Sequence, residues 1–321
     1  GAALLLLPAA TRAGELRAVD ALFTAVSALC VTGLTVVDTG STFTHFGQLV
    51  ILGLIQIGGL GVMTVSSLLA LMIGRRLSLR SSQAVQEGLN LPEFSSPGRL
   101  LRAVVLFTLV AEGLGALLLY FSFVRAHAPV SAAYQAIFHS ISAFCNAGFG
   151  LYPDNFEGYV GDWLVNWTVT TLVILGGIGF FTVHDVRRYL DPRQVRRRLS
   201  LHSKLVLTAT VILITAGAGL IYLLEYAGTL RGLDAGTKYL AAYFQSVTCR
   251  TAGFSTLPVG GMGAATLLVM IVLMFIGGSP GGTAGGVKTT SAGVLLLLLY
   301  ALIHERSQVQ AFGRRLPRDL V

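Results

Sequence analysis

Charged residues are scarce in this chain: Asp, Glu, Lys and Arg make up only 12% of its 321 residues, whereas 54% are hydrophobic. Soluble domains carry roughly 25% charged residues. Apolar runs long enough to cross the ~30 Å hydrocarbon core of a bilayer as helices recur along the chain. The composition therefore excludes a soluble globular protein and predicts an all-α, multi-pass membrane protein. The long apolar segments are 46–73, 100–124, 163–184, 203–224 and 262–303.

Residues that usually carry catalysis or bind metals are also few. The three cysteines lie in separate stretches and form no disulfide framework, and the six histidines are scattered. No paired carboxylates and no Ser-His-Asp arrangement fall on one predicted helix face. The apolar segment 1–9 lacks the features of a cleavable signal, and we interpret it as the end of a truncated first membrane helix. We therefore expect neither an enzyme nor a covalently bound cofactor, and we expect the cysteines to be small buried packing residues.

The net charge of +8 is unevenly placed. Basic residues gather in segments 74–102, 187–204 and 306–318, whereas the loops at the opposite ends of the apolar runs carry acids such as Asp154 and Asp234. Basic loops of membrane proteins remain in the cytoplasm. The pattern predicts a cell (plasma or inner) membrane protein, surrounded by the lipid bilayer, with its basic loops cytoplasmic. It argues against a nucleic-acid partner.

Three shorter apolar pieces, 20–30, 133–145 and 239–249, interrupt this plan. Each is about ten residues long, too short to cross a membrane as a helix. Each is followed by a glycine and then by a long apolar run. Irregular backbone at membrane depth is tolerated only where protein buries it or water lines it. We therefore predict re-entrant half-helices that enter from the outer side and return as extended loops.

These pieces are internal repeats, aligned on Gly33, Gly148 and Gly253. We predict tandem units of helix, re-entrant pore loop and helix around a central pore. A fourth glycine at a similar interval would fall beyond residue 321, so either the pore is threefold or the chain is a fragment without a fourth unit; we favour the fragment. The aligned sequences are ALFTAVSALCVTGLT (21–35), AIFHSISAFCNAGFG (136–150) and AYFQSVTCRTAGFS (242–255). The predicted units are 1–80, 81–202 and 203–321.

A ring of such loops can line an ion path. Extended backbone can aim several carbonyl oxygens at one axis, where they replace the hydration shell of an alkali cation. Glycine permits backbone angles that side chains resist, and the C-terminal end of each half-helix adds partial negative charge. No carboxylate lies in 31–35, 146–150 or 251–255. The loops therefore favour a monovalent cation over a divalent one.

The stretch GGSPGGTAGGVKTT (277–290) must break the helix predicted over 262–303, because it is rich in helix-breaking residues. A plain kink is one interpretation and a mobile gate is the favoured one. A phosphate loop is disfavoured, since Val287 rather than glycine precedes Lys288. The shorter clusters GGLG (58–61) and GGIG (176–179) could be dinucleotide-binding turns. They are expected to lie mid-helix within apolar runs, however, and we interpret them as sites of close helix packing.

Two charged residues stand out within apolar surroundings. Glu112 lies inside a long apolar run, where it would either couple a proton or sodium ion or accept hydrogen bonds from a neighbouring element; we favour the second role. Arg250 lies beside the third loop, where we expect it to pair with a carboxylate as a brace, the alternative being that it tunes the field of the loop. His139 is expected to act as a hydrogen-bonding partner on its half-helix.

Taken together, these motifs resemble the TrkH/TrkG/KtrB superfamily of potassium transporters. VTGLT, NAGFG and TAGFS look like its selectivity loops, and segments 45–64 and 81–90 are similar to the KtrB branch. The resemblance implies four units in a complete chain, with pseudo-fourfold symmetry like a potassium channel, and K+ as the transported ion at the filter. The filter residues that it implies are Val31, Thr32, Gly33, Asn146, Ala147, Gly148, Thr251, Ala252 and Gly253. The implied gate loop comprises Gly277, Gly278, Ser279, Pro280, Gly281, Gly282, Thr283, Ala284, Gly285, Gly286 and Lys288.

The resemblance also implies partners: a cytoplasmic nucleotide-binding regulatory subunit like KtrA or TrkA, and a second copy in a homodimer. Nothing in the chain itself predicts nucleotide binding, and sodium dependence stays open. The rival function is an alternating-access, ion-coupled secondary carrier. Carriers often show inverted repeats and charged sites at mid-membrane, whereas these repeats are parallel and only Glu112 supplies such a charge.

Overall fold

The computed structural model describes residues 1–12, 16–76, 97–192, 198–304, 310–312 and 314–315. The KtrB-like segment 81–90 and part of each basic segment lie outside the described residues. The helices are α1 (Ala2–Leu5), η1 (Pro8–Ala10), α2 (Ala18–Leu29), α3 (Thr39–Thr42), α4 (His45–Arg76), α6 (Pro97–Phe123), α7 (Pro129–Phe144), η2 (Glu157–Tyr159), α8 (Trp163–Ile178), α9 (Phe180–Leu190), α10 (Leu201–Glu225), α11 (Ala235–Thr248), η3 (Val259–Gly261), α12 (Ala264–Phe275) and α13 (Thr289–Ile303). Two short strands, β1 (Gln310–Ala311) and β2 (Arg314–Arg315), pair antiparallel.

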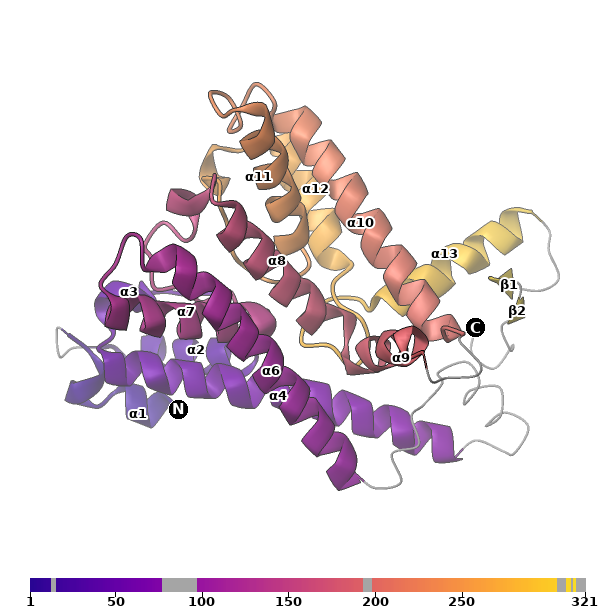
Figure 1. Ribbon diagram of the computed structural model, residues 1–321, viewed down its shortest axis with the longest axis horizontal. Coiled ribbons are helices and arrows are strands. Elements are labelled where there is room, and N and C mark those ends of the chain that lie inside the picture. Colours follow the sequence, from indigo (N-terminus) through magenta and orange to yellow (C-terminus); the bar gives the residue numbers. More distant parts are fainter. Residues whose placement is uncertain (13–15, 77–96, 193–197, 305–309, 313, 316–321) are drawn as a thin grey trace.

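The short apolar pieces form the half-helices that the sequence predicts. They are α2, α7 and α11, of 12, 16 and 14 residues. Each lies between a preceding and a following helix, and α7 packs between α6 and α8 as α11 packs between α10 and α8 (Figure 1). The predicted all-α class with repeated pore-loop units is confirmed in the described residues.

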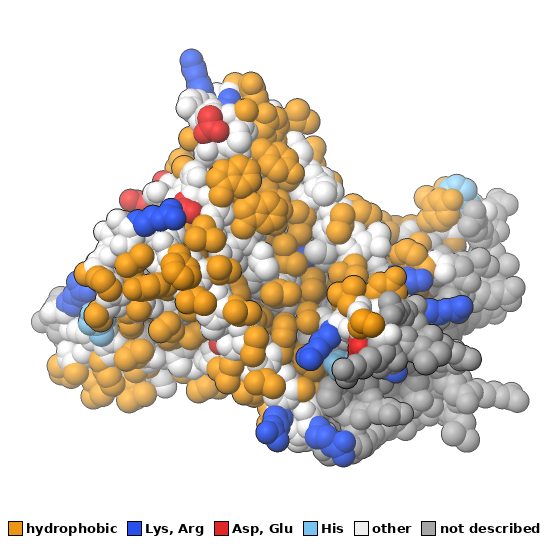
Figure 2. Space-filling view, in the orientation of Figure 1, with side chains coloured by type: hydrophobic (Ala, Val, Ile, Leu, Met, Phe, Trp, Pro, Cys, Tyr) orange, Lys and Arg blue, Asp and Glu red, His pale blue; other side chains and the backbone are white. Residues whose placement is uncertain are grey.

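Three of the described helices are long and apolar enough to cross a membrane: His45–Val65 within α4, Gly98–Phe123 within α6, and α10. Their outward side chains are apolar and exposed, as Leu106 is at 61%. Figure 2 shows hydrophobic side chains over much of the visible face. Such a surface suits contact with hydrocarbon and would be costly in water.

The predicted apolar helix over 163–184 is broken, which corrects the mid-helix interpretation of GGIG. Helix α8 ends at Ile178, α9 begins at Phe180, and the two are bent by 101°. Gly179 between them has φ +83°, which a right-handed helix cannot contain. A Cβ on Gly179 would lie 2.5 Å from the carbonyl oxygen of Pro280, so the 277–288 loop fills the bend.

Both glycine clusters do pack closely, as predicted, although only GGLG lies within an unbroken helix. In the continuous helix α4, a Cβ on Gly58 would collide with the carbonyl oxygen of Leu29, at the end of the first half-helix. In α8, a Cβ on Gly176 would collide in the same way with the carbonyl oxygen of Phe144. The helix that follows each of these half-helices therefore needs glycine where it meets the half-helix end.

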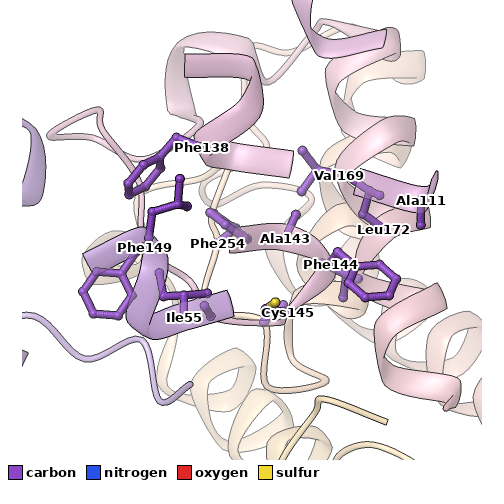
Figure 3. Close-up of a cluster of buried hydrophobic side chains, with 14 of the residues drawn as sticks. Ile55, Ala111, Phe138, Ala143, Phe144, Cys145, Phe149, Val169, Leu172 and Phe254 are labelled. Atoms are coloured by element: carbon purple, nitrogen blue, oxygen red, sulfur yellow. The ribbon is translucent and has the colours of Figure 1, made fainter. Parts of the chain in front are cut away.

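The core surrounds the second half-helix (Figure 3). Phe144 of α7 is fully buried, and around α7 lie Ile55 of α4, Leu172 of α8 and Phe254 of the third loop. Because α4, α8 and the third loop come from three different units, burial of α7 holds the units together. Inside a bilayer such contacts stabilise the fold through close van der Waals packing, because lipid tails are as apolar as these side chains.

Polar caps begin several of these helices at the loops. The Asp162 carboxylate accepts hydrogen bonds from the backbone N–H groups of Leu164 and Val165 at the start of α8. Asp234 caps the half-helix α11 by accepting from Thr237 N at 3.0 Å. Side-chain and backbone hydrogen bonds from Thr237 lower the pKa of Asp234. An ionised cap at this end also complements the positive end of the helix dipole.

Candidate functional site

The three predicted filter loops share one unusual backbone conformation. In each loop two residues have positive φ, and the residue between them does not. Reversing the handedness at alternate residues turns successive peptide groups toward one side of the backbone. Two of the positions are β-branched, for which positive φ is strained, so the surroundings must hold these loops in place. The residues with positive φ are Val31 (54°), Gly33 (80°), Asn146 (57°), Gly148 (69°), Thr251 (62°) and Gly253 (80°).

The loops meet one another at their glycines. A Cβ on Gly33 would lie 2.5 Å from the carbonyl oxygen of Ala147 in the second loop. A Cβ on Gly148 would lie 2.8 Å from the carbonyl oxygen of Ala252 and 3.0 Å from the Cα of Gly253 in the third loop. The structure thus brings together predicted residues that lie far apart in the sequence. Backbone oxygens and glycines, rather than side chains, occupy the meeting point.

Each loop is attached to its own half-helix by a hydroxyl group that the sequence analysis missed. A Ser or Thr near the end of the half-helix donates a hydrogen bond to the carbonyl of the residue directly after the loop glycine. The available signal was a hydroxyl residue five or six positions before that glycine in every repeat. The bonds are Ser27 Oγ to Leu34 O, Ser142 Oγ to Phe149 O and Thr248 Oγ1 to Phe254 O, each 2.7 Å.

The cysteines near the half-helix ends differ in burial. Cys145 and Cys249 are buried, as predicted, but Cys30 is exposed, which corrects the expectation for that residue. Cys145 is buried because it packs against α4 of the preceding unit, where a Cβ on Gly59 would lie 2.5 Å from its Sγ. The described chain places no helix of a preceding unit against Cys30.

The predicted gate loop is a compact, internally hydrogen-bonded structure between α12 and α13. Gly278 N donates to Gly285 O at 2.9 Å, and Gly277 N donates to Val287 O at 3.1 Å. The hydroxyls of Ser279 and Thr289 lie 2.7 Å apart. The helix break predicted here is confirmed, and the broken segment is ordered by its own backbone bonds.

This loop docks onto the break in the second unit. The carbonyls of Gly176 and Gly177 are free because α8 ends at Ile178, and they accept hydrogen bonds from Thr283 N (3.0 Å) and Ser279 N (2.8 Å). Unsatisfied carbonyls at a helix end need such partners inside a membrane. The break in α8 and the loop of the third unit therefore complete each other.

The same loop also contacts two of the predicted filter units. Gly285 N donates to Thr251 Oγ1 of the third filter loop at 2.9 Å. Thr283 Oγ1 donates to Phe144 O, at the end of the second half-helix, at 3.1 Å. Lys288 donates from Nζ to Ala284 O within the loop at 2.8 Å. The 277–288 loop is thus held directly against the ends of two half-helices.

The polar residues outside the loops take mainly structural positions. His139 lies 2.8 Å from Gln135 O through Nδ1, and its Nε2 accepts from Leu151 N at 3.1 Å, which confirms its hydrogen-bonding role. Arg250 is 3% exposed, and none of its guanidinium nitrogens has a hydrogen-bond partner in the described part of the chain. The predicted carboxylate brace is therefore wrong for the described residues. The carbonyls at the end of α11, just before Arg250, supply partial negative charge nearby.

Glu112 lies behind the second half-helix. Its Oε1 is 3.9 Å from Cys145 Sγ, and its backbone oxygen accepts from Ser140 Oγ at 2.6 Å. We expect Glu112→Gln, which keeps volume and hydrogen-bonding capacity, to leave cation uptake within about twofold of wild type. The measurement is cation uptake into vesicles that contain the protein, first with a fixed proton or sodium gradient and then with that gradient reversed. A variant that loses its response to either gradient would instead make Glu112 a coupling site.

Comparison with known proteins identifies the family of the chain. Residues 5–317 match the family described as "TrkH: Cation transport protein". Ktr system potassium uptake protein B of Bacillus subtilis is 46% identical over 273 residues, covering 84% of this chain and 60% of the relative. The protein of the same name from Vibrio alginolyticus is 43% identical, covering 84% of this chain and 59% of the relative. Potassium/sodium uptake protein NtpJ of Enterococcus hirae is 37% identical over 323 residues, covering 100% of this chain and 71% of the relative.

A solved structure is similar as well. The crystal structure of the potassium transporter TrkH from Vibrio parahaemolyticus superposes with a TM-score of 0.72 at 19% identity, covering 95% of this chain and 61% of that chain. At that identity the similarity shows the fold alone. This chain spans about three fifths of the length of the two relatives named as potassium uptake protein B.

Proposed function

The chain belongs to the TrkH family of cation transport proteins, and from this premise we propose that it forms part of a path for potassium ions across the cell membrane. The observation that supports this most strongly is the meeting of the three glycine loops, with carbonyl oxygens of one loop against the glycine of the next. Relatives named as potassium uptake proteins support the choice of ion. Their names are those of uptake proteins, in keeping with a transporter rather than an enzyme.

In the proposed mechanism, the carbonyls of the filter residues replace the hydration shell of K+. The half-helices α2, α7 and α11 end at the loops, so their partial negative charges add to the attraction for a cation. A site made of backbone dipoles, without a full carboxylate charge, binds a monovalent ion weakly enough for it to leave.

We further propose that the 277–288 loop closes this path on its inner side. Its contacts with Thr251 and with the end of α7 place it against the filter units. Its docking bonds are neutral hydrogen bonds, each worth about 1 kcal/mol, so a modest input can release it. A loop that reaches across from the third unit to the second is well suited to block a path between them.

The remaining proposals concern surroundings and partners. The basic residues on the described helices, such as Arg99 and Arg102 on α6 and Arg187 and Arg188 on α9, would face the cytoplasm. There a nucleotide-binding regulatory subunit would dock, and two copies of the full chain would form a homodimer. The units 1–80, 81–202 and 203–321 remain the proposed division. The name of NtpJ includes sodium, which makes sodium a second candidate ion.

Uptake by the full-length protein tests the proposal. In vesicles of defined lipid, we expect radiolabelled Rb+, a substitute for K+, to enter at least about tenfold faster than through protein-free vesicles, and faster than Na+. Unlabelled K+ should compete with the label and Ca2+ should not. Equal entry of Rb+ into protein-free vesicles, or competition by Ca2+ alone, would contradict a potassium path.

A further inference from the structure

The hydroxyl residue at the end of each half-helix holds its loop at two points, one on either side of the glycine. Its hydroxyl donates to the carbonyl of the residue after the glycine, at 2.7 Å in all three units. Its own backbone carbonyl accepts from the N–H of the residue before the glycine. Those backbone bonds are Thr32 N to Ser27 O (2.8 Å), Ala147 N to Ser142 O (2.8 Å) and Ala252 N to Thr248 O (2.9 Å).

The same pair of hydrogen bonds recurs in all three units, although the residue type and its spacing from the glycine differ. Two units use serine six residues before the glycine, whereas the third uses threonine five residues before it. In every case the acceptor is the same carbonyl relative to the glycine. In the third unit the threonine also accepts from Phe254 N at 2.9 Å, which strengthens the attachment. We call Ser27, Ser142 and Thr248 the loop clamp.

The clamp lies where water cannot easily replace it. Ser27, Ser142 and Thr248 are 4%, 0% and 7% exposed. Removing a buried donor leaves its carbonyl acceptor unsatisfied, and that carbonyl must turn to find another partner. Any such turn would displace the backbone next to the loop glycine.

Residues in a strained conformation lie next to the clamped segment. Between the two anchor points lies the loop glycine with positive φ, and β-branched Val31 and Thr251 with positive φ lie just before the anchored stretches of their loops. Such conformations persist only when the surroundings over-determine them. Ion preference in carbonyl sites depends on the spacing, number and freedom of the oxygens, and a functional site tolerates errors of only about 0.5 Å.

We propose that the loop clamp consists of positioning residues that set the ion preference of the path, through hydrogen bonds that fix the carbonyls around each loop glycine. This inference rests on the proposed potassium path. It assigns a role to three hydroxyls that donate to loop carbonyls, and it predicts that their loss alters selectivity without disturbing how the half-helices pack.

The second unit offers a matched pair of variants. Ser142→Ala removes the clamp hydroxyl. Ser140→Ala removes a hydroxyl from the same half-helix with the same burial, 0% exposed, that donates to Glu112 O of α6 instead of to the loop. Ser142→Thr restores the hydroxyl, and Thr248 shows that threonine can serve as a clamp in this fold.

The full-length protein is tested in vesicles for the ratio of Rb+ to Na+ uptake, and in detergent for the difference in melting temperature between K+ and Na+. An ion that binds only the folded protein raises its melting temperature. We expect Ser142→Ala to lower the uptake ratio about fivefold and to remove most of the melting difference. Ser140→Ala and Ser142→Thr should retain both the uptake ratio and the melting difference of the wild-type protein.

Each other result overturns the inference. A wild-type ratio and melting difference in Ser142→Ala would show that the clamp does not set selectivity. Equal losses in both alanine variants would assign the hydroxyls to helix packing. A wild-type protein that neither takes up Rb+ nor is stabilised by K+ more than by Na+ would overturn the proposed function and the clamp together. Failure of the clamp alone is recognised because the wild-type protein then still takes up Rb+ selectively.

Discussion

Gly148→Ser is expected to reduce Rb+ uptake by more than about tenfold. Gly148 has φ +69°, a conformation that costs a residue with a side chain about 1–2 kcal/mol. A Cβ there would also lie 2.8 Å from the carbonyl oxygen of Ala252 and 3.0 Å from the Cα of Gly253. The second loop must then move away from the third, and the carbonyls at their meeting point lose their common geometry. Initial rates of radiolabelled uptake at equal protein content measure the loss.

Gly150→Ser is the control for this experiment. Gly150 lies in the same loop, but its φ is not positive, and the nearest atom to a Cβ there is His139 Nε2 at 3.6 Å. We expect the control to keep at least about half of the wild-type rate, because an ordinary contact replaces the clash. If Gly148→Ser transports normally with unchanged preference for Rb+ over Na+, the loops are packing elements. The ion path would then have to be sought around Glu112.

Gly282→Ala is expected to accelerate Rb+ uptake by up to about tenfold. A Cβ on Gly282 would lie 2.7 Å from Gly177 O and 2.8 Å from Gly176 O, the two carbonyls that hold the 277–288 loop. Weakening two hydrogen bonds worth about 1 kcal/mol each shifts the balance between docked and released loop by an order of magnitude or more. If the docked loop closes the path, its release raises the rate while the ratio of Rb+ to Na+ stays the same.

Gly285→Ala tests whether this effect comes from the docking surface. Gly285 lies in the same loop, and the nearest atom to a Cβ there is Thr251 Oγ1 at an ordinary 3.9 Å. The rate of Rb+ uptake by the Gly285→Ala protein should stay near that of wild type. A slower Gly282→Ala protein with normal folding and expression would contradict a blocking role and would show that the loop supports the open path. A changed ion ratio would place the loop within the selective part of the path.

The sequence alone was sufficient for the repeated architecture. The half-helices lie within a few residues of their predicted ranges, because a short apolar stretch closed by glycine is a local pattern, and the membrane leaves it few conformations. The positions of Gly33, Gly148 and Gly253 followed from alignment of the repeats, and their positive φ angles agree with the reason for expecting glycine. The break over 277–290 followed from its helix-breaking residues in the same way.

Contacts between units were decided only by the tertiary structure. The bend at Gly179 was missed because GGIG reads like the unbroken GGLG of α4, and what distinguishes them is the loop from residues 277–288 that fills the bend. The exposure of Cys30 and the unpaired state of Arg250 within the described residues depend on which helix faces them. The clamp hydroxyls were missed because serine and threonine are common near helix ends. Local patterns determined the half-helices and the break over 277–290. The break at Gly179, and which carbonyl meets which glycine, depend on distances between segments remote in sequence, and only the folded chain sets those distances.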